Sequence, residues 1–373
     1  MVGRKWLTQV MLVFMGLALA FMMLELGLRV WFTQQGTEHD RILYIYDRET
    51  IASKTTQLLG LPYLNYGLNP AWEDINARGV RGELVAVPKP DDVYRIVTLG
   101  GSTTFGHALA VEETWPAQLQ RILREDYGYT QVEVVNLGAP GYFSLDSVVN
   151  LATHGLAHEP DMVIVYHGIN DAINRMFQDS QCYQGDTPLY GMALDRGIWQ
   201  VALDDLPPST LYRVLAFALG AMDDPSEFDS RLEHTGLCPP EPQGISPVNL
   251  LAQHPPTHFE RNMRSIAGMT QAAGATMVFS TFAWDVPLAE HALAENPEFS
   301  QLQAQLMAID EQNDLLRRLA PELDALLVDL ASELGEGTYF QGDMVHQTVE
   351  GARRQAEIYA AFLDAQGVIS NVL

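Results

Sequence analysis

From residue 94 onward, short apolar and β-branched runs alternate with amphipathic segments of helical spacing. This alternation leaves few architectures open, because parallel strands joined by helical crossovers must be covered by helices on both faces. The run 162–166 is nearly all apolar, as expected of a central strand in such a sheet. We therefore predict an α/β fold on a five-stranded parallel sheet, with strands at 94–99, 132–137, 162–166, 276–282 and 326–330.

The helices between these strands are predicted from apolar stripes and terminal residues. Thr114 can cap a helix that buries one stripe, made of Trp115, Leu119, Ile122 and Leu123. Ser144 can cap the next helix, whose expected inward side chains are Leu145, Val148, Val149, Ala152 and Leu156. Further helices are expected from 259 to a stop at Gly274, from about 299 to 319, and from 349 to 362.

The N-terminus carries a candidate membrane segment. Arg4 and Lys5 precede an uncharged, mainly apolar stretch of 19 residues from Trp6 to Leu24. As a helix this stretch would be roughly 28 Å long, close to the hydrocarbon thickness of a bilayer. Basic residues ahead of a span favour a cytoplasmic N-terminus, so a single-pass anchor at 1–35 would place the rest of the chain on the extracytoplasmic, periplasmic side.

A cleavable signal peptide is the alternative to this anchor. Ala18-Leu19-Ala20 has the small-residue pattern of a cleavage site. We favour the uncleaved anchor because apolar residues continue from Phe21 through Leu24 and recur as far as Phe32. Both interpretations export the domain that follows.

Beyond the anchor, the chain is predicted to form a linker and lead-in at 36–92 and a single domain at 93–370. From about 178 to 257 the periodic pattern gives way to Pro, Gly and acidic residues, apart from a helical patch near 211–219. Irregular insertions of this length are usually lids or binding loops. The two cysteines, Cys182 and Cys238, lie in this insertion. In an exported domain we expect a disulfide between them, with two unpaired thiols as the alternative.

The formal net charge is −25, from 22 Lys and Arg against 47 Asp and Glu. A surface of this sign repels nucleic acid, which excludes nucleic-acid partners. We also expect no metal and no cofactor. His154 and His158 have the spacing of a ligand pair, but the adjacent Glu159 would point away from them on a helix.

The segment Gly100-Gly101-Ser102-Thr103-Thr104 directly follows the first predicted strand. A tight glycine turn there lifts the Ser102 hydroxyl out of the sheet edge and aims nearby backbone N–H groups at a common point. Two interpretations fit the segment equally well: a nucleophilic serine, and a serine that caps the next helix or lines an anion-binding turn. A Walker phosphate loop is excluded because no Gly-Lys-Ser/Thr follows.

A second polar element, Asp343-Met344-Val345-His346, lies between the last strand and the final helix. A serine hydroxyl becomes a good nucleophile when a histidine accepts its proton, and that histidine needs an acceptor on its other nitrogen. Residues three apart in a turn lie on one side, so Asp343 can reach the ring of His346. The alternative is a surface histidine beside a helix-capping aspartate. Asp329, at the end of the last strand, is the second candidate carboxylate.

The loops 136–141 and 168–171 follow the second and third predicted strands. Attack on an ester carbonyl develops an oxyanion, and fixed donors aimed at it contribute about 3 kcal/mol each. An Asn amide and a Gly N–H suit that task, since Gly lets a substrate approach the main chain closely. Ordinary turn chemistry is the alternative, because Asn, Asp, Gly and Pro populate turns regardless of function.

Taken together, these elements on successive strand ends resemble the SGNH hydrolase family, also called GDSL esterases and lipases. The resemblance covers 95 to about 363, apart from the insertion. It implies a flavodoxin-like three-layer α/β/α sandwich with Ser102 as nucleophile, His346 as base and Asp343 as the group that orients it. It also implies an oxyanion hole made by Ser102, Gly141 and Asn170. Gly138 is the alternative to Gly141.

The sequence departs from the family's name motif, having Gly101 where Asp is usual and Thr103 where Leu is usual. The N-terminal anchor and the Gly-Gly-Ser-Thr form resemble a bacterial branch that often acts on glycan-linked acyl groups. We therefore predict a membrane-anchored serine esterase that hydrolyses a short acyl ester on a small molecule or glycan outside the cytoplasm. An O-acyltransferase with the same triad and a non-catalytic glycan-binding module are the alternatives.

Overall fold

The computed structural model describes residues 2–47, 50, 58–59, 61, 64, 66–177, 209–221, 244–296 and 300–369. The chain divides into two compact units. The first unit contains Met1–Leu58 and Leu194–Arg231, and the second contains Leu59–Ala193 and Leu232–Leu373. The chain therefore enters the second unit, returns to the first, and enters the second again.

In its described part, the first unit consists of the helices α1 (Val2–Gln35), α2 (Glu38–Tyr44) and α9 (Thr210–Ala218). Helix α9 confirms the helical patch predicted near 211–219. Over Gln9–Gln35, α1 is long and apolar enough to cross a membrane, and this stretch is not buried. An apolar helix near the N-terminus is a property that membrane anchors and signal sequences share.

The second unit is built on a five-stranded sheet in the order β4-β3-β5-β6-β7, with every neighbouring pair parallel. This order confirms the predicted flavodoxin-like topology. Every residue of β3 and β5 is buried, because helices cover both faces of these central strands. The strands are β3 (Tyr94–Gly100), β4 (Val132–Asn136), β5 (Met162–Tyr166), β6 (Thr276–Ser280) and β7 (Leu326–Val328).

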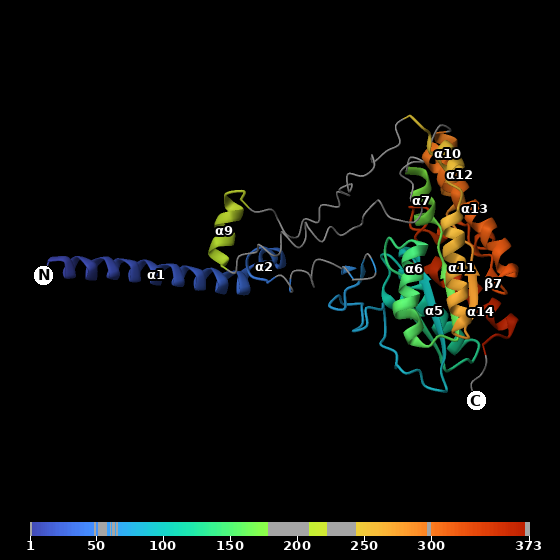
Figure 1. The fold of residues 1–373 in the computed structure, drawn as a ribbon, viewed down its shortest axis with the longest axis horizontal. Helices are drawn as coiled ribbons and strands as arrows, with labels where there is room; N and C mark the ends of the chain where they lie inside the picture. The colour runs from blue at the N-terminus through green and yellow to red at the C-terminus, as the bar shows by residue number, and fades with distance from the viewer. Residues whose placement is uncertain are drawn as a thin grey trace. The chain divides into compact units, whose positions relative to one another are not determined.

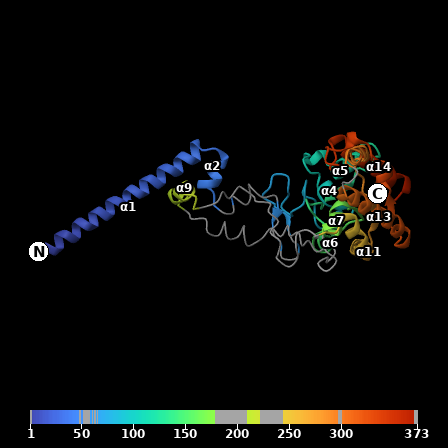
Figure 2. The ribbon, with the colours of Figure 1, turned by 90° about the horizontal axis from the view of Figure 1, so that it is seen from above.

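Helices lie on both faces of this sheet (Figures 1 and 2). On one face, α5 and α14 pack around a core that includes Trp115 and Tyr359. On the other face, α6, α11 and α13 cover a core that includes Met263 and Phe279. The predicted three-layer α/β/α sandwich is therefore confirmed. These helices are α5 (Trp115–Glu125), α6 (Ser144–Asn150), α11 (Thr257–Ala272), α13 (Ser300–Glu322) and α14 (Val349–Gln366).

Shorter elements connect this framework. The strands and α-helices among them are β1 (Leu58–Leu59), β2 (Gly67–Leu68), α4 (Ser102–Phe105), α7 (Ile169–Phe177), α10 (Pro247–Gln253) and α12 (Val286–Glu295). The single turns of 3-10 or π type are η1 (Val111–Glu113), η2 (Leu151–Gly155), η3 (Leu156–His158), η4 (Leu330–Ser332) and η5 (Gly337–Tyr339). Helix α10 lies inside the predicted insertion, and α12 is a helix that the sequence pattern did not predict.

The apolar stripe predicted for α6 is only partly right, because Val148 and Leu156 pack against the apolar core but the most buried face of the helix is polar. Its N-cap is Phe143, and its buried face is polar, with Ser144, Ser147 and Asn150, whereas Ala152 is exposed. This polar face lies against hydrogen-bonding groups of other elements. Asn150, for example, donates through Nδ2 to the Leu137 carbonyl at 3.2 Å.

Part of the predicted lead-in packs into the second unit. Arg81 is buried, and it forms an isolated antiparallel bridge with Asn136 at the end of β4. The two cysteines, Cys182 and Cys238, lie outside the described residues. The disulfide between them therefore stays a prediction.

Candidate active site

The polar residues singled out in the sequence gather at the carboxyl ends of the central strands. Ser102 is the first residue of α4, directly after β3, and Asn170 is the second residue of α7, after β5. Gly100 of β3 pairs with Tyr166 of β5, so the two strands end at the same level. The strand order reverses between β3 and its two neighbours, which is where open α/β sheets bind ligands.

Two glycines allow the tight turn that presents Ser102. A Cβ atom on Gly100 would lie 2.1 Å from Thr104 Oγ1 and 2.6 Å from the Tyr166 carbonyl oxygen, distances that no real side chain tolerates. A Cβ atom on Gly101 would lie 3.0 Å from Asn170 Nδ2. The glycine that replaces the usual Asp of the family motif therefore leaves room for the Asn170 amide beside the serine.

Ser102, His346 and Asp343 form a continuous line of hydrogen bonds. His346 Nε2 lies 2.7 Å from Ser102 Oγ, and His346 Nδ1 lies 2.5 Å from Asp343 Oδ2. The Asp343 carboxylate also accepts the His346 backbone N–H at 2.9 Å. Met344 between them has φ +74°, a left-handed conformation that closes the turn and brings the aspartate back toward the histidine ring. The structure thus brings together all three residues of the predicted triad.

The protonation state of this line follows from Asp343. Partial burial raises the pKa of the Asp343 carboxyl, but hydrogen bonds from the backbone N–H and the ring of His346 lower it by more, so the pKa lies below its usual value. An ionised carboxylate can only accept a hydrogen bond, so His346 Nδ1 carries the proton that faces it. His346 Nε2 is then left to accept the Ser102 hydroxyl.

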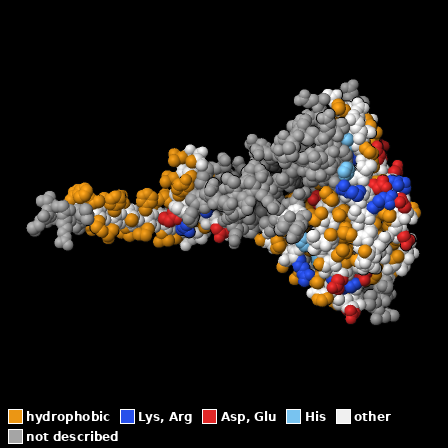
Figure 3. Space-filling view, viewed as in Figure 1, with side chains coloured by type: hydrophobic (Ala, Val, Ile, Leu, Met, Phe, Trp, Pro, Cys, Tyr) orange, Lys and Arg blue, Asp and Glu red, His pale blue; other side chains and the backbone are white. Residues whose placement is uncertain are grey.

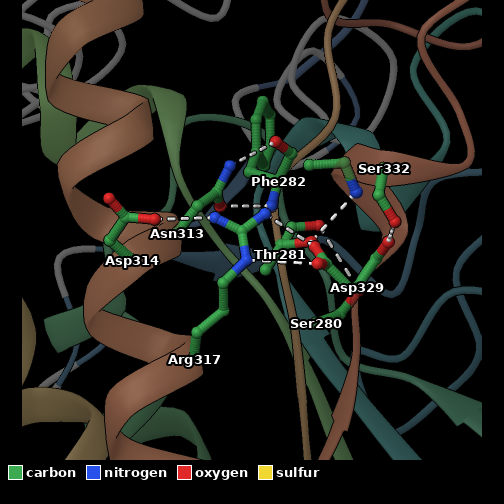
Figure 4. A network of polar contacts seen from close by, with 9 residues as sticks. Ser280, Thr281, Phe282, Asn313, Asp314, Arg317, Asp329 and Ser332 are labelled. Atoms are coloured by element: carbon green, nitrogen blue, oxygen red, sulfur yellow. Dashed lines mark hydrogen bonds and ion pairs between the residues drawn. The ribbon is translucent and has the colours of Figure 1, made fainter.

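Asp329, the second candidate carboxylate, has other partners. It accepts hydrogen bonds from Thr281 Oγ1 at 2.8 Å and from Arg317 Nη2 at 2.8 Å, as Figure 4 shows. This network joins the end of β7 to the residue after β6 and to α13. Asp329 therefore ties the ends of β6 and β7 to α13, and Asp343 is the carboxylate that contacts His346.

The predicted oxyanion donors come from the serine turn and from the loops that follow β4 and β5. The Ser102 N–H stands in the first turn of α4, where backbone N–H groups have no partner within the helix. Asn170 Nδ2 uses one hydrogen on the Tyr142 carbonyl at 2.9 Å, which leaves its second hydrogen. Gly141, next to Tyr142, has φ +76°. By contrast, the Gly138 N–H donates to Asn136 Oδ1 at 3.0 Å, and a Cβ there would meet the Phe105 nitrogen at 2.5 Å, so Gly138 is committed to packing.

Arg81 is a residue of the site that the sequence pattern did not reveal. Its Nη1 atom donates to the carbonyls of Phe105 at 2.6 Å and Gly106 at 2.7 Å, and its guanidinium lies 4.1 Å from the centre of the Phe105 ring. The cation therefore caps the carboxyl end of α4, the helix that begins with Ser102. An isolated Arg in an aperiodic segment carries no sequence signal of this role.

His107 is the second such residue. Its ring centre lies 4.9 Å from the ring centre of His346. Burial, followed by the neighbouring His346, lowers the pKa of His107. A neutral imidazole thus stands beside the triad histidine, five residues after the serine in the sequence.

A further serine, histidine and aspartate lie in the interior behind the donor loops. Ser147 Oγ lies 2.7 Å from His167 Nε2, and His167 Nδ1 lies 3.8 Å from Asp171 Oδ2. Asp171 also accepts the Ser144 backbone N–H, which ties the start of α6 to the start of α7. We call Ser147, His167 and Asp171 the interior set. Complete burial lowers the pKa of His167 to about 3.

An accessible serine, histidine and aspartate in hydrogen-bond order at this point of a doubly wound sheet are the groups of a serine hydrolase. The family model for the GDSL-like lipase/acylhydrolase family matches residues 98–354. The chain belongs to this family, and it is a serine hydrolase that acts on ester bonds.

Solved structures similar to this chain have low sequence identity. The chain is 16% identical to a lipase/acylhydrolase from Enterococcus faecalis, covering 74% of this chain and 97% of that one with a TM-score of 0.42. It is 15% identical to the acetyl xylan esterase AlAXEase, covering 72% and 99% with a TM-score of 0.42. It is 16% identical to the protein TesA, covering 74% of this chain and 99% of that one with a TM-score of 0.43. No curated protein matches the chain.

Proposed function

We propose that this protein is an extracytoplasmic esterase that hydrolyses a short acyl ester with Ser102, His346 and Asp343 as its catalytic triad. The observation that carries the proposal is the unbroken hydrogen-bond line from Ser102 Oγ through the imidazole to Asp343, with distances of 2.7 Å and 2.5 Å. The donor loops support it, because Asn170 Nδ2 and the carbonyl of Tyr142, the residue after Gly141, both lie beside Gly101 in the serine turn.

The geometry supports a two-step reaction. Ser102 Oγ attacks the ester carbonyl carbon while His346 Nε2 takes the hydroxyl proton, and the carbonyl π electrons move to its oxygen. The resulting oxyanion accepts hydrogen bonds from the Ser102 N–H, the Gly141 N–H and Asn170 Nδ2, each worth about 3 kcal/mol in the transition state. Collapse breaks the ester C–O bond, and His346 returns the proton to the leaving alcohol. Water, deprotonated by His346 Nε2, then attacks the acyl carbon. Collapse breaks the bond to Ser102 Oγ, which takes the proton from His346 as the acid leaves.

The environment of the triad fits hydrolysis in an aqueous setting. The His346 side chain is 19% exposed and that of Asp343 is 49% exposed, so water can reach the base. The net charge of −25 favours neutral substrates over polyanions by Coulomb repulsion. The exposure of His346 supports hydrolysis by water. The charge supports an acylated glycan or a similar neutral, polar ester as the substrate.

We also propose that α1 anchors the protein in the membrane, and the described part of the first unit supports this anchor. Helix α1 has an exposed apolar surface along Gln9–Gln35, and the residues ahead of it include Arg4 and Lys5. This charge distribution favours a cytoplasmic N-terminus and an exported catalytic unit. Accessibility of cysteines introduced at Leu84 and at Gly3, with both native cysteines replaced by serine, to a membrane-impermeant maleimide in intact cells tests the orientation. The proposal expects labelling at the first position alone.

An esterase screen over acetyl to octanoyl esters tests the catalytic part. The parent and the Ser147→Ala variant, which keeps the surface triad, should release free acid, and Ser102→Ala should not. Release of free acid in the presence of an acceptor sugar supports hydrolysis, whereas transfer of the acyl group to the sugar would identify an O-acyltransferase. Turnover by Ser102→Ala equal to that of the parent would refute the assignment of the nucleophile.

A further inference from the structure

Helix α9 begins on a carboxylate supplied by α1. Thr210 N donates to Glu25 Oε1 at 2.9 Å, and Leu211 N donates to Glu25 Oε2 at 2.8 Å. Ser209 Oγ donates to the same carboxylate at 2.9 Å, and Arg29 Nε donates to it at 2.7 Å. Because the first N–H groups of a helix lack partners within it and favour an anion, Glu25 fixes the start of α9 beside α1.

The inner face of α9 is held by further contacts within the first unit. Arg213 Nη1 donates to the Tyr46 carbonyl at 2.7 Å. The Tyr44 ring lies between Phe32 of α1, at 4.5 Å between ring centres, and Phe217 of α9, at 5.8 Å. Helix α9 is therefore docked on the end of α1 and on α2 through its polar and aromatic inner face.

The outer face of α9 is apolar and uncharged. Its large exposed side chains are Tyr212, Leu215 and Leu219, which are 58%, 51% and 80% exposed. Spacings of three and four residues place these side chains on one face of the helix. Arg213 is the one charged residue between 209 and 221, and it is buried in the inner face. Among the described residues outside α1 and α9, large exposed apolar side chains occur singly, at Leu84, Tyr127, Val286, Met307 and Val349.

This outer face continues the exposed apolar surface of α1. Leu26, Val30 and Trp31 of α1 are exposed, and Figure 3 shows hydrophobic side chains covering both α1 and α9. Glu25 directly follows the uncharged run that ends at Leu24. In a spanning α1, Glu25 therefore marks the boundary of the hydrocarbon region, and the helix that it caps begins at that boundary.

We propose that α9 is a second membrane contact, an interfacial helix whose face of Tyr212, Leu215 and Leu219 inserts into the outer leaflet of the bilayer that α1 spans. This inference rests on the proposed membrane anchor. The partner is a zwitterionic lipid surface, because this face offers no cation to anionic headgroups, and a tyrosine beside leucines suits the headgroup boundary. The chain leaves the second unit after α7 and re-enters it before α10, so a lipid-bound α9 ties the catalytic unit to the membrane at additional points.

Depth-dependent fluorescence quenching tests this contact on the full-length protein in phosphatidylcholine vesicles. Leu215→Cys and Leu219→Cys, in a background with both native cysteines replaced by serine, are labelled with a polarity-sensitive fluorophore. Lipids that carry a spin label near the headgroup should quench both labels at least about twofold more than a label on Leu84→Cys, since quenching requires contact with the lipid. Leu84 is a matched control, an exposed leucine of the second unit.

A label on Leu17→Cys in α1, measured with lipids that carry the spin label deep in the acyl chain because residue 17 lies inside the proposed span, separates the two proposals. If the label at residue 17 is quenched but the labels at residues 215 and 219 are quenched no more than the label at residue 84, the role of α9 is overturned and the anchor stands. Absence of quenching at residue 17 would overturn both. Turnover of a soluble ester by each labelled variant verifies that the catalytic unit is folded.

The Glu25→Leu variant tests how α9 is placed. It removes the carboxylate cap and keeps α1 apolar, so quenching at residue 215 should fall toward the level of residue 84 while that at residue 17 is unchanged. Quenching at residue 215 that equals the level with Glu25 present would contradict the placement of α9 by this carboxylate.

Discussion

The molecule contains two sets of serine, histidine and aspartate side chains in the same order. The surface set is Ser102, His346 and Asp343, and the interior set is Ser147, His167 and Asp171. In both sets the distance from serine Oγ to histidine Nε2 is 2.7 Å. The serine–histidine contact therefore does not by itself distinguish a catalytic group from a structural one.

The aspartate and the surroundings separate the two sets. Asp343 lies 2.5 Å from the ring nitrogen of its histidine, whereas Asp171 lies 3.8 Å away and accepts Ser144 instead. The His167 side chain is 2% exposed, and burial lowers its pKa to about 3, so it cannot take a proton from a serine near neutral pH. The comparison teaches that a catalytic histidine needs an anion that stabilises its charged form as well as a serine within reach.

Replacing the two serines gives the largest expected difference between the sets. Ser102→Ala should lower kcat by about 10⁵-fold or more, because the triad acts as a unit. Ser147→Ala should keep kcat within about tenfold of the parent and lose about 1–3 kcal/mol of unfolding free energy, since it leaves a buried imidazole without its partner. Steady-state kinetics with a short-chain ester and urea unfolding measure both quantities. Equal losses of kcat in the two variants would break the comparison.

The aspartates provide the next test. Asp343→Asn should reduce kcat by about 10³- to 10⁴-fold, because an amide no longer favours the imidazolium or fixes the ring tautomer. Asp329→Asn is the matched control, since Asp329 pairs with Arg317 and Thr281 instead of with His346 (Figure 4). This control should retain kcat. If it were the more damaging change, the carboxylate of the triad would be misassigned.

Asn170 links the two sets, because it precedes Asp171 of the interior set and stands beside the surface serine. Asn170→Ala should lower kcat by about 10²-fold, with KM nearly unchanged, because the lost donor acts on the oxyanion and not on the bound ester. Gly138→Ala offers a contrast, because its Cβ would clash with the backbone of α4. This variant should lose activity through impaired folding and not through a specific loss of kcat. Normal kcat for Asn170→Ala would remove this side chain from the oxyanion hole.

The interior set also predicts a smaller, pH-dependent effect on stability. His167 has a folded pKa of about 3, and an unfolded histidine titrates near about 6.5. Between these values the unfolded chain binds a proton that the folded protein does not, so stability is full above about pH 6.5 and falls as the pH drops, by at most about 1.4 kcal/mol per unit. Urea unfolding of the parent and of His167→Gln across this range measures it. The variant should lose this part of the slope, and identical slopes would contradict the burial of a neutral His167.

The fold was predictable because its strands are buried on both faces. β5 is apolar along its whole length, and β3 is buried along its whole length although it contains Arg95 and Thr98. Thr114 caps α5 as expected. The stripe on α6 was only partly right because the most buried face of this helix meets polar partners, and periodicity of apolar residues cannot identify such a face. Helix α12 escaped prediction because its single buried residue, Ala289, gives no stripe.

The surface set could be predicted from the sequence because its members follow strands and the carboxyl ends of parallel strands converge. Arg81 and the interior set depend on contacts between distant segments, and neither a motif nor a spacing marks them. Arg81 reaches Phe105 across 24 residues, and Ser147 reaches His167 across 20 residues. The sequence indicated the groups that we propose to react, whereas the contacts of Arg81 and of the interior set emerged from the packing.

Covalent labelling with a fluorophosphonate, followed by mass spectrometry of the modified peptide, tests the central claim most directly. The surface set should react at Ser102, and the label should be absent in Ser102→Ala, strongly reduced in His346→Ala and unchanged in Ser147→Ala. Modification of any other residue, or labelling that persists in Ser102→Ala, would contradict the account.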